Sequence, residues 1–230
     1  MIQQVTLKID GMPVKTFKGA SVLDAALASG ICIPHLCYVP VLKDYGACRL
    51  CIVEHVINGR EKITTSCTLI AEEEMVIRSD TEKIKKLRRN IAELLVAQAP
   101  NSRAIQDIAM RCGVTEVRYP FRNDNCVQCG RCVRYCTEYT QAHALGFVGR
   151  GTDRHVDFPL GFRRDLCKNC GFCTEYCPMT ITPCGGPMKR GKEHLCGKCQ
   201  GQQETMSYLP GACVRCDLGK GFNCARHAYA

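Results

Sequence analysis

The sequence predicts an α+β protein, in which a small sheet with one helix is followed by a helical segment and then by a long cysteine-dense region. Two observations predict this. Short alternations of polar and apolar residues before residue 79 give way to helical spacing after it, and 20 of the 230 residues are cysteine. The other apolar residues are too few to build a large core across several lobes, so we expect bound metal to help stabilise the chain.

The first 79 residues predict a compact α+β domain. Residues 4–10 and 12–17 alternate around Gly11, which is typical of a hairpin. Ser21, followed by Asp24 three residues later, predicts an N-cap and a short helix that ends at Gly30. The remaining strands are expected over residues 51–56, 62–66 and 75–78, with a turn at 58–59.

Residues 80–119 predict a helical linker. Ser79 and Glu82 suit a capping box, and apolar residues then recur at helical spacing up to Pro100. We interpret the Lys and Arg side chains between them as a solvated face, the alternative being a surface for an acidic partner. A second helix is expected over residues 102–112, with Gly113 as the residue that ends it.

Four cysteines of the first domain follow the spacing C-x10-C-x2-C-x15-C. Three ligands in one loop and a fourth at the end of a strand suit a [2Fe-2S] cluster. Ordinary thiols or a zinc site are the alternatives, although a ten-residue gap is unusual for a zinc ribbon. The expected ligands are Cys37, Cys48, Cys51 and Cys67.

Two identical runs of C-x2-C-x2-C-x3-C predict a domain with two [4Fe-4S] cubanes over residues 120–183. In this bacterial ferredoxin spacing, the fourth cysteine of each run binds the cluster of the other run. We therefore assign the first cubane to Cys126, Cys129, Cys132 and Cys177, and the second to Cys136, Cys167, Cys170 and Cys173.

Residues 184–230 form a cysteine-rich tail with two further C-x2-C pairs. Four sulfurs in this arrangement suit zinc or a further iron-sulfur cluster alike, and the choice stays open. The candidate ligands are Cys196, Cys199, Cys213 and Cys216, with Cys184 and Cys224 outside the motif. Cys32 and Cys112 are expected to be buried small hydrophobic residues.

Charge and hydropathy exclude several classes of protein. The formal charge is +9, but three oxidised clusters of about −2 each would leave about +3, so nucleic acid is not expected as a partner. Neither a secretory signal nor a membrane span is expected, which predicts a cytoplasmic protein.

Three stretches carry a resemblance to a known family: residues 33–37, the motif GACRLC at 46–51, and CVQCGRCVR at 126–134 with GFVGRG at 146–151. They resemble the diaphorase iron-sulfur subunit of soluble NAD-reducing hydrogenases, and are similar to the amino-terminal part of the large iron-sulfur subunit of respiratory complex I. The resemblance covers about residues 1–183. It implies a β-grasp [2Fe-2S] domain, a helical linker and a two-cubane ferredoxin-like domain. The cluster that family members hold with one His and three Cys is not expected here, because residues 95–119 contain Cys112 and no His.

The expected function is that of a non-catalytic relay subunit in an NAD(P)-linked oxidoreductase of the hydrogenase, formate dehydrogenase or electron-bifurcating type. The resemblance implies a flavin- and NAD(P)-binding partner subunit, and a second redox subunit would complete the relay. One alternative is the iron-sulfur subunit of a succinate dehydrogenase type enzyme. Another is a zinc-stabilised scaffold or nucleic-acid-binding module, which would be colourless where an iron-sulfur protein is brown.

Overall fold

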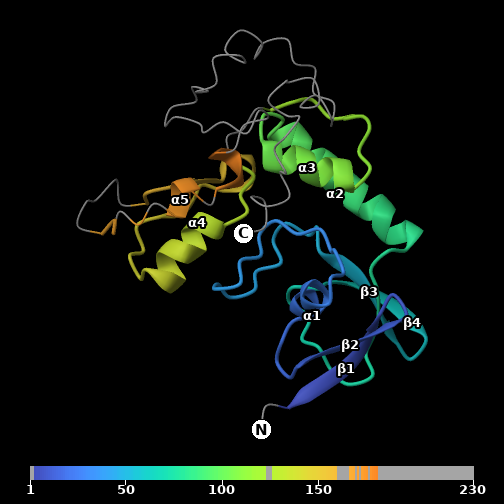
Figure 1. The fold of residues 1–230 in the computed structure, drawn as a ribbon. Helices are drawn as coiled ribbons and strands as arrows, with labels where there is room; N and C mark the ends of the chain where they lie inside the picture. Colours follow the sequence, from blue (N-terminus) through green and yellow to red (C-terminus); the bar gives the residue numbers. More distant parts are fainter. Residues whose placement is uncertain are drawn as a thin grey trace, which may run out of the picture. The chain divides into compact units, whose positions relative to one another are not determined.

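The computed structural model describes residues 3–122, 126–159, 166–168, 170, 172–175 and 177–180. The chain divides between Ile91 and Ala92 into two compact units, each with its own internal packing. Helix α2, Glu82–Gln98, begins in the first unit and ends in the second (Figure 1). Among the described residues, no helix is long and apolar enough to cross a membrane.

A five-stranded sheet with the order β2-β1-β5-β3-β4 organises the first unit (Figure 1). Strand β1 is antiparallel to β2 and parallel to β5, whereas β3 is antiparallel to both β4 and β5. The hairpins turn where the sequence predicts them, at Gly11 and Gly59, and both glycines have positive φ. The strands are β1 Gln4–Ile9, β2 Met12–Phe17, β3 Ile52–Ile57, β4 Arg60–Thr65 and β5 Val76–Arg78.

Helix α1, Val22–Ala28, packs its apolar side chains into the core of this unit. It begins at the predicted capping box: the Ser21 side chain accepts from the backbone N–H of Asp24, and the Asp24 carboxylate accepts from the backbone N–H of Ser21. Strand and helix side chains share one apolar cluster, which includes Leu7, Ile9, Val22, Leu23, Ala26, Val53 and Ile77.

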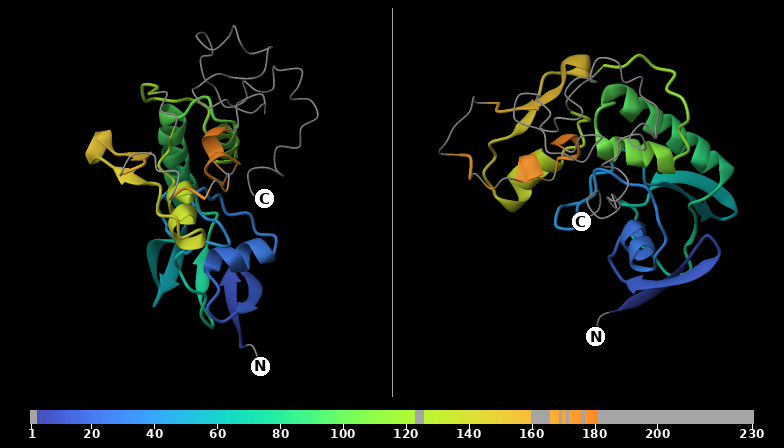
Figure 2. Two further views of the ribbon diagram at one scale, coloured as in Figure 1. Left: turned by 90° about the vertical axis from the view of Figure 1, so that its left-hand side faces the viewer. Right: turned by 45° about the horizontal axis from the view of Figure 1, so that its top comes forward.

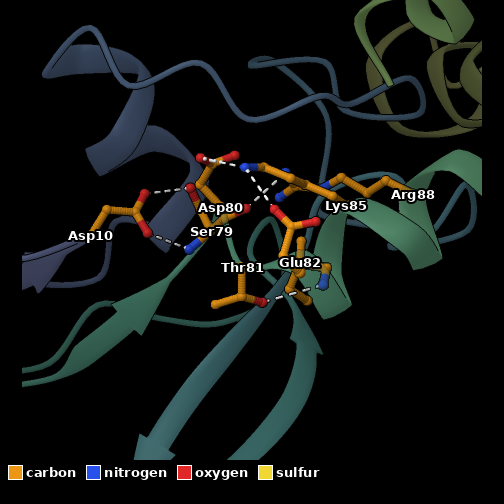
Figure 3. A network of polar contacts seen from close by, with 8 residues as sticks. Asp10, Ser79, Asp80, Thr81, Glu82, Lys85 and Arg88 are labelled. Atoms are coloured by element: carbon orange, nitrogen blue, oxygen red, sulfur yellow. Dashed lines mark hydrogen bonds and ion pairs between the residues drawn. The ribbon is translucent and has the colours of Figure 1, made fainter. Parts of the chain in front are cut away.

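The start of α2 differs from the sequence prediction. Ser79 does not form a capping box with Glu82, because its N–H and its hydroxyl both donate to the carboxylate of Asp10, each at 2.6 Å (Figure 3). The Thr81 hydroxyl caps the helix instead and accepts from the N–H of Ile84 at 3.2 Å. Ser79 therefore joins the end of β5 to the turn after β1. Its partner Asp10 lies 69 residues away in the sequence, so the local sequence could not predict this contact.

The second unit contains short elements. The C-terminal half of α2 is joined to the following chain by Glu93, whose carboxylate accepts from the backbone N–H of Arg118 at 2.6 Å and from its guanidinium at 2.7 Å. Helix α3, Arg103–Arg111, has Ser102 as its N-cap and Cys112 as its C-cap, and Gly113 follows with positive φ, as predicted. The remaining elements are α4 Arg131–Arg134, η1 Tyr135–Tyr139, β6 Gly146–Val148, η2 Gly151–Asp153, β7 His155–Asp157, α5 Phe172–Glu175 and η3 Pro178–Thr180.

Two features of the second unit bear on its cysteines. Segments α4 and η1 form one continuous helical stretch that changes to π-helical geometry at Tyr135 (yellow in Figure 2). Strands β6 and β7 form a separate two-stranded ribbon, shown in gold. Such short elements bury little apolar surface, so this part of the chain depends on other stabilising interactions.

Candidate iron-sulfur sites

The first cysteine group lies where two loops meet the end of the sheet. Cys37 follows α1, Cys48 and Cys51 precede β3, and Cys67 follows β4. Cys37, Cys51 and Cys67 are each 1% exposed, and Cys48 is half-buried. The structure thus brings all four predicted ligands of the [2Fe-2S] cluster into one buried region of the first unit.

These four cysteines lie as two pairs. The sulfurs of Cys51 and Cys67 are 3.4 Å apart, close to the separation of about 3.8 Å expected for two thiolates on one tetrahedral metal with bonds of about 2.3 Å. In the other pair, the backbone N–H of Cys37 donates to the sulfur of Cys48 at 3.5 Å. Across the described ranges, no three Cys, His, Asp or Glu side chains group closely enough to hold a single metal ion. Two pairs of sulfurs fit a two-iron rhomb, in which each iron takes two thiolates, better than one zinc.

Burial and hydrogen bonding control the protonation of these thiols. The hydrogen bond from the Cys67 thiol lowers the pKa of Cys51 to about 7. The same bond, together with burial, raises the pKa of Cys67, and the contact with Cys37 raises the pKa of Cys48. Since a thiolate is the form that binds metal, loading this site requires the release of protons from buried thiols.

The residues next to Cys37 are fixed by the cap of α1. The Tyr38 hydroxyl donates to the Asp24 carboxylate, and burial raises the pKa of that hydroxyl, which keeps it protonated as a donor. His35 lies edge-on to the Tyr38 ring, and its Nδ1 is 2.9 Å from the carbonyl of Ile33, so this nitrogen donates within the loop. The capping residue Asp24 thus also positions the chain around a predicted ligand, a second role that the sequence did not reveal.

Gly46 packs against the turn that carries Cys67. Its φ is +65°, and a Cβ at this position would lie 3.2 Å from Thr68 Cγ2 and 3.3 Å from Thr65 Oγ1. Cys67 lies between those two threonines, in a turn closed by the N–H of Thr68 and the carbonyl of Thr65. A side chain at position 46 would therefore press on the threonine side chains on both sides of the predicted ligand Cys67.

We expect Gly46→Ala to weaken retention of the [2Fe-2S] cluster about tenfold, a typical effect of disturbing the residues that support metal ligands. The matched control is Gly59→Ala, where φ is +74° and nothing lies within 4 Å of the added Cβ. Both variants should lose about 1–2 kcal/mol of stability from the positive φ. Visible absorbance during dilution with a chelator measures retention, and equal retention in the two variants would contradict this role of Gly46.

The first cubane run lies in the second unit, around the start of α4. Cys129 is buried, and Gly130 at φ +74° precedes the helix that carries Cys132. Burial, followed by the charges of Cys129, Cys177 and Cys126, raises the pKa of Cys132 to about 12. The structure thus places Cys177 of the second run, like Cys126 and Cys129, close enough to Cys132 to raise its pKa.

Ser102 holds the chain beside Cys177. This residue is fully buried at the N-cap of α3, and its hydroxyl donates to the carbonyl of Pro178 at 2.7 Å. Helix α3 packs against η3, which begins at Pro178. Helix α3 of the linker therefore supports the chain beside a predicted cluster ligand, a contact that its apolar spacing did not predict.

Ser102→Ala is expected to cost about 1–3 kcal/mol, because it removes the N-cap and leaves the Pro178 carbonyl without this donor. During exposure to a chelator, the variant should lose one cubane faster than the wild-type protein does. Low-temperature EPR measures this loss. Ser29→Ala changes an exposed serine and serves as the control. Equal rates of loss would mean that Ser102 does not support Cys177.

The second cubane run is described only in part. Cys136 lies in η1, where its sulfur accepts from the backbone N–H of Ala144 at 3.3 Å. Cys167 is half-buried, and Cys170 and Cys173 are exposed. The ring of Tyr135 stacks on Phe172 with centroids 3.6 Å apart, so the residues that precede Cys136 and Cys173 are in contact. The structure therefore brings the surroundings of Cys136 to the second run.

Other cysteine predictions have mixed outcomes. Cys112 is buried as expected, at the end of α3. The expectation for Cys32 is wrong: this residue is exposed, because the core takes up Ile33, which is 1% exposed, from the adjacent position. The tail candidates Cys184, Cys196, Cys199, Cys213, Cys216 and Cys224 lie outside the described residues.

Comparison with known proteins agrees with this geometry. Residues 3–82 match the model of a 2Fe-2S iron-sulfur cluster binding domain. One subunit of an NADH-quinone oxidoreductase of Rhizobium meliloti is 34% identical over 66% of this chain and 21% of its own length. A chain of an NAD+-reducing [NiFe]-hydrogenase of known crystal structure is 30% identical, with a TM-score of 0.60, over 67% of this chain and 75% of the other. The chain belongs to this family of iron-sulfur subunits.

Membership in the iron-sulfur subunit family confirms the resemblance found in the sequence. It also confirms a [2Fe-2S]-binding domain in the first part of the chain. A further relative is the mitochondrial NADH dehydrogenase [ubiquinone] iron-sulfur protein 1 of Solanum tuberosum, 31% identical over 64% of this chain and 23% of its own length. The chain spans about a quarter of the length of these curated relatives. The two cubane sets, the tail site and the partner subunits stay predictions.

Proposed function

We propose that this chain relays single electrons between a flavoprotein that reacts with NAD(P) and a second redox subunit of a hetero-oligomeric complex. The relatives named above are subunits of NADH-quinone oxidoreductases, and a further similar chain comes from an NAD+-reducing hydrogenase. An iron-sulfur cluster supplies one-electron chemistry, which is what connects a two-electron carrier to a one-electron chain.

The proposal includes one [2Fe-2S] cluster and two [4Fe-4S] clusters. The [2Fe-2S] cluster would be held by the paired sulfurs of the first unit. The observation that carries the cubane assignment is the grouping of Cys132 with Cys126, Cys129 and Cys177, because a shared set across 51 residues of sequence is what the crossed ligation of two cubanes requires. The tail cysteines Cys196, Cys199, Cys213 and Cys216 would bind zinc or a further cluster.

The protein's own residues would control the clusters in three ways. Buried thiols such as Cys51 and Cys67 exclude water from the ligand sphere. Backbone N–H groups donate to ligand sulfurs, as Gln128 does to Cys126 and Ala144 to Cys136, each at 3.3 Å. Such donors stabilise the more negative, reduced state, and the rigid attachment limits rearrangement when an electron arrives.

Anaerobic purification of the tagged full chain from its host tests this function. We expect a flavin-containing subunit to co-purify, and added NADH or NADPH to produce the EPR signals of reduced clusters within the complex. Reduction by succinate would instead support a succinate dehydrogenase type complex. A colourless, zinc-loaded chain without a flavoprotein would contradict the relay.

A further inference from the structure

Arg88 is a charged side chain buried beside the first cysteine group. It lies on α2 four residues after Ile84 and four before Ala92, and both of these neighbours are fully buried. Residues at this spacing lie on one face of a helix, so Arg88 faces inward and is 6% exposed. Its assignment to a solvated Lys and Arg face is therefore wrong, whereas Arg89 is exposed as expected.

The Arg88 guanidinium binds the backbone on both sides of a cluster ligand. Nε donates to the carbonyl of Leu50 at 3.1 Å, and Nη2 donates to the carbonyl of Ile52 at 2.7 Å. These carbonyls belong to the residues directly before and after Cys51. The planar fork of an arginine can hold two such acceptors in a fixed relation, which a lysine cannot. Arg88 thus fixes the backbone from which the Cys51 thiolate projects.

A third hydrogen bond connects Arg88 to the network at the start of α2. Nη1 donates to the carbonyl of Ser79 at 2.9 Å (Figure 3). The Asp10 carboxylate in the same network accepts from the N–H and hydroxyl of Ser79. Ser79 thus accepts from Arg88 on its carbonyl and donates to Asp10 from its N–H and hydroxyl, which holds the guanidinium at a third point.

A buried guanidinium is costly unless nearby negative charge offsets its desolvation. Cys51 and Cys67 are themselves buried, and a [2Fe-2S] cluster on four thiolates carries about −2 when oxidised and about −3 when reduced. A fixed positive charge one peptide unit from a ligand stabilises the reduced form more than the oxidised form, because the attraction grows with the negative charge.

We infer that Arg88 is a positioning residue that raises the reduction potential of the [2Fe-2S] cluster, by placing a buried positive charge against the backbone of Cys51. This inference rests on the proposed [2Fe-2S] site of the first unit. It assigns Arg88 a role that the exposed Lys and Arg side chains of the same helix do not share.

A redox titration of the anaerobic full-length protein, followed by EPR of the reduced [2Fe-2S] signal, tests this role. We expect Arg88→Gln to shift the equilibrium at least tenfold toward the oxidised cluster, a fall of about 59 mV for a one-electron couple. Arg89→Gln removes the same formal charge from an exposed neighbour and should leave the potential unchanged. Arg88→Lys keeps the charge without the fork and should retain most of the potential, with an altered EPR line shape.

The outcomes distinguish failure of the proposed [2Fe-2S] site from failure of the role assigned to Arg88. A wild-type protein without a [2Fe-2S] signal would overturn the site and the inference together. A normal wild-type signal with the same potential in Arg88→Gln, or an equal fall in Arg89→Gln, would overturn the role of Arg88 alone. If Arg88→Gln does not fold, Arg88→His provides the test. The reduction potential of the [2Fe-2S] cluster in this variant should be low, or should fall as the pH rises. A wild-type potential at every pH would overturn the inference.

Discussion

Replacing Cys136 by alanine is expected to remove the cubane of the second run and to leave that of the first. Under crossed ligation, Cys136 completes the set of Cys167, Cys170 and Cys173, although it lies in the first run. The protein should lose about four of about ten irons. Low-temperature EPR of the reduced protein should show one cubane instead of two.

The matched variants make this result specific. Cys177→Ala should remove the other cubane. Cys177 is predicted to share that cluster with Cys132, and the structure places these two cysteines close together. Cys32→Ala changes an exposed cysteine outside every predicted set and should leave the iron content unchanged. A Cys136→Ala protein with two intact cubanes, or one that loses the same cubane as Cys177→Ala, would contradict the crossed assignment.

Removal of iron is expected to unfold the second unit's cysteine region far more than the sheet of the first unit. Segments α4, η1, β6, β7 and α5 are each three to five residues long. Sites built from thiolates contribute on the order of 10 kcal/mol to the folding of small domains. In contrast, the first unit has a continuous apolar core that includes Leu7, Leu23 and Ile77, all fully buried.

Hydrogen exchange with mass spectrometry measures this difference in the full chain. After anaerobic chelation, amides of residues 126–159 should exchange near the rate of an unfolded chain, whereas those of β1, β3 and β5 should keep partial protection. The metal-loaded protein, taken through the same steps without chelator, is the control. Unchanged protection in residues 126–159 would show that the cysteine region folds without metal.

Sequence reasoning was most successful where local chemistry decides the structure. The capping box of Ser21 and Asp24, the turn glycines and the ends of α3 depend on residues within a few positions of one another, and the structure has them as predicted. Cysteine spacing is a local signal of the same kind, since a metal centre selects a ligand spacing whatever the rest of the chain does. It predicted the [2Fe-2S]-binding domain that the family match over residues 3–82 confirms.

Long-range contacts account for what the sequence did not predict. Ser79 takes Asp10 as its partner rather than Glu82, and Ser102 takes the carbonyl of Pro178, 76 residues away. Arg88 could have been recognised, because it occupies the apolar face of α2 between Ile84 and Ala92. We instead grouped Arg88 with the surrounding Lys and Arg residues. The carbonyls of Leu50 and Ile52 that accept from Arg88 are known only from the fold.

Counting iron and acid-labile sulfide in the anaerobically purified full chain, together with Mössbauer spectroscopy, tests the central claim most directly. One [2Fe-2S] and two [4Fe-4S] clusters predict about ten irons and about ten sulfides per chain, with about one fifth of the iron in the two-iron site. A further cluster in the tail would raise both counts and leave the three assigned clusters in place. A colourless protein with zinc and without labile sulfide would contradict the account.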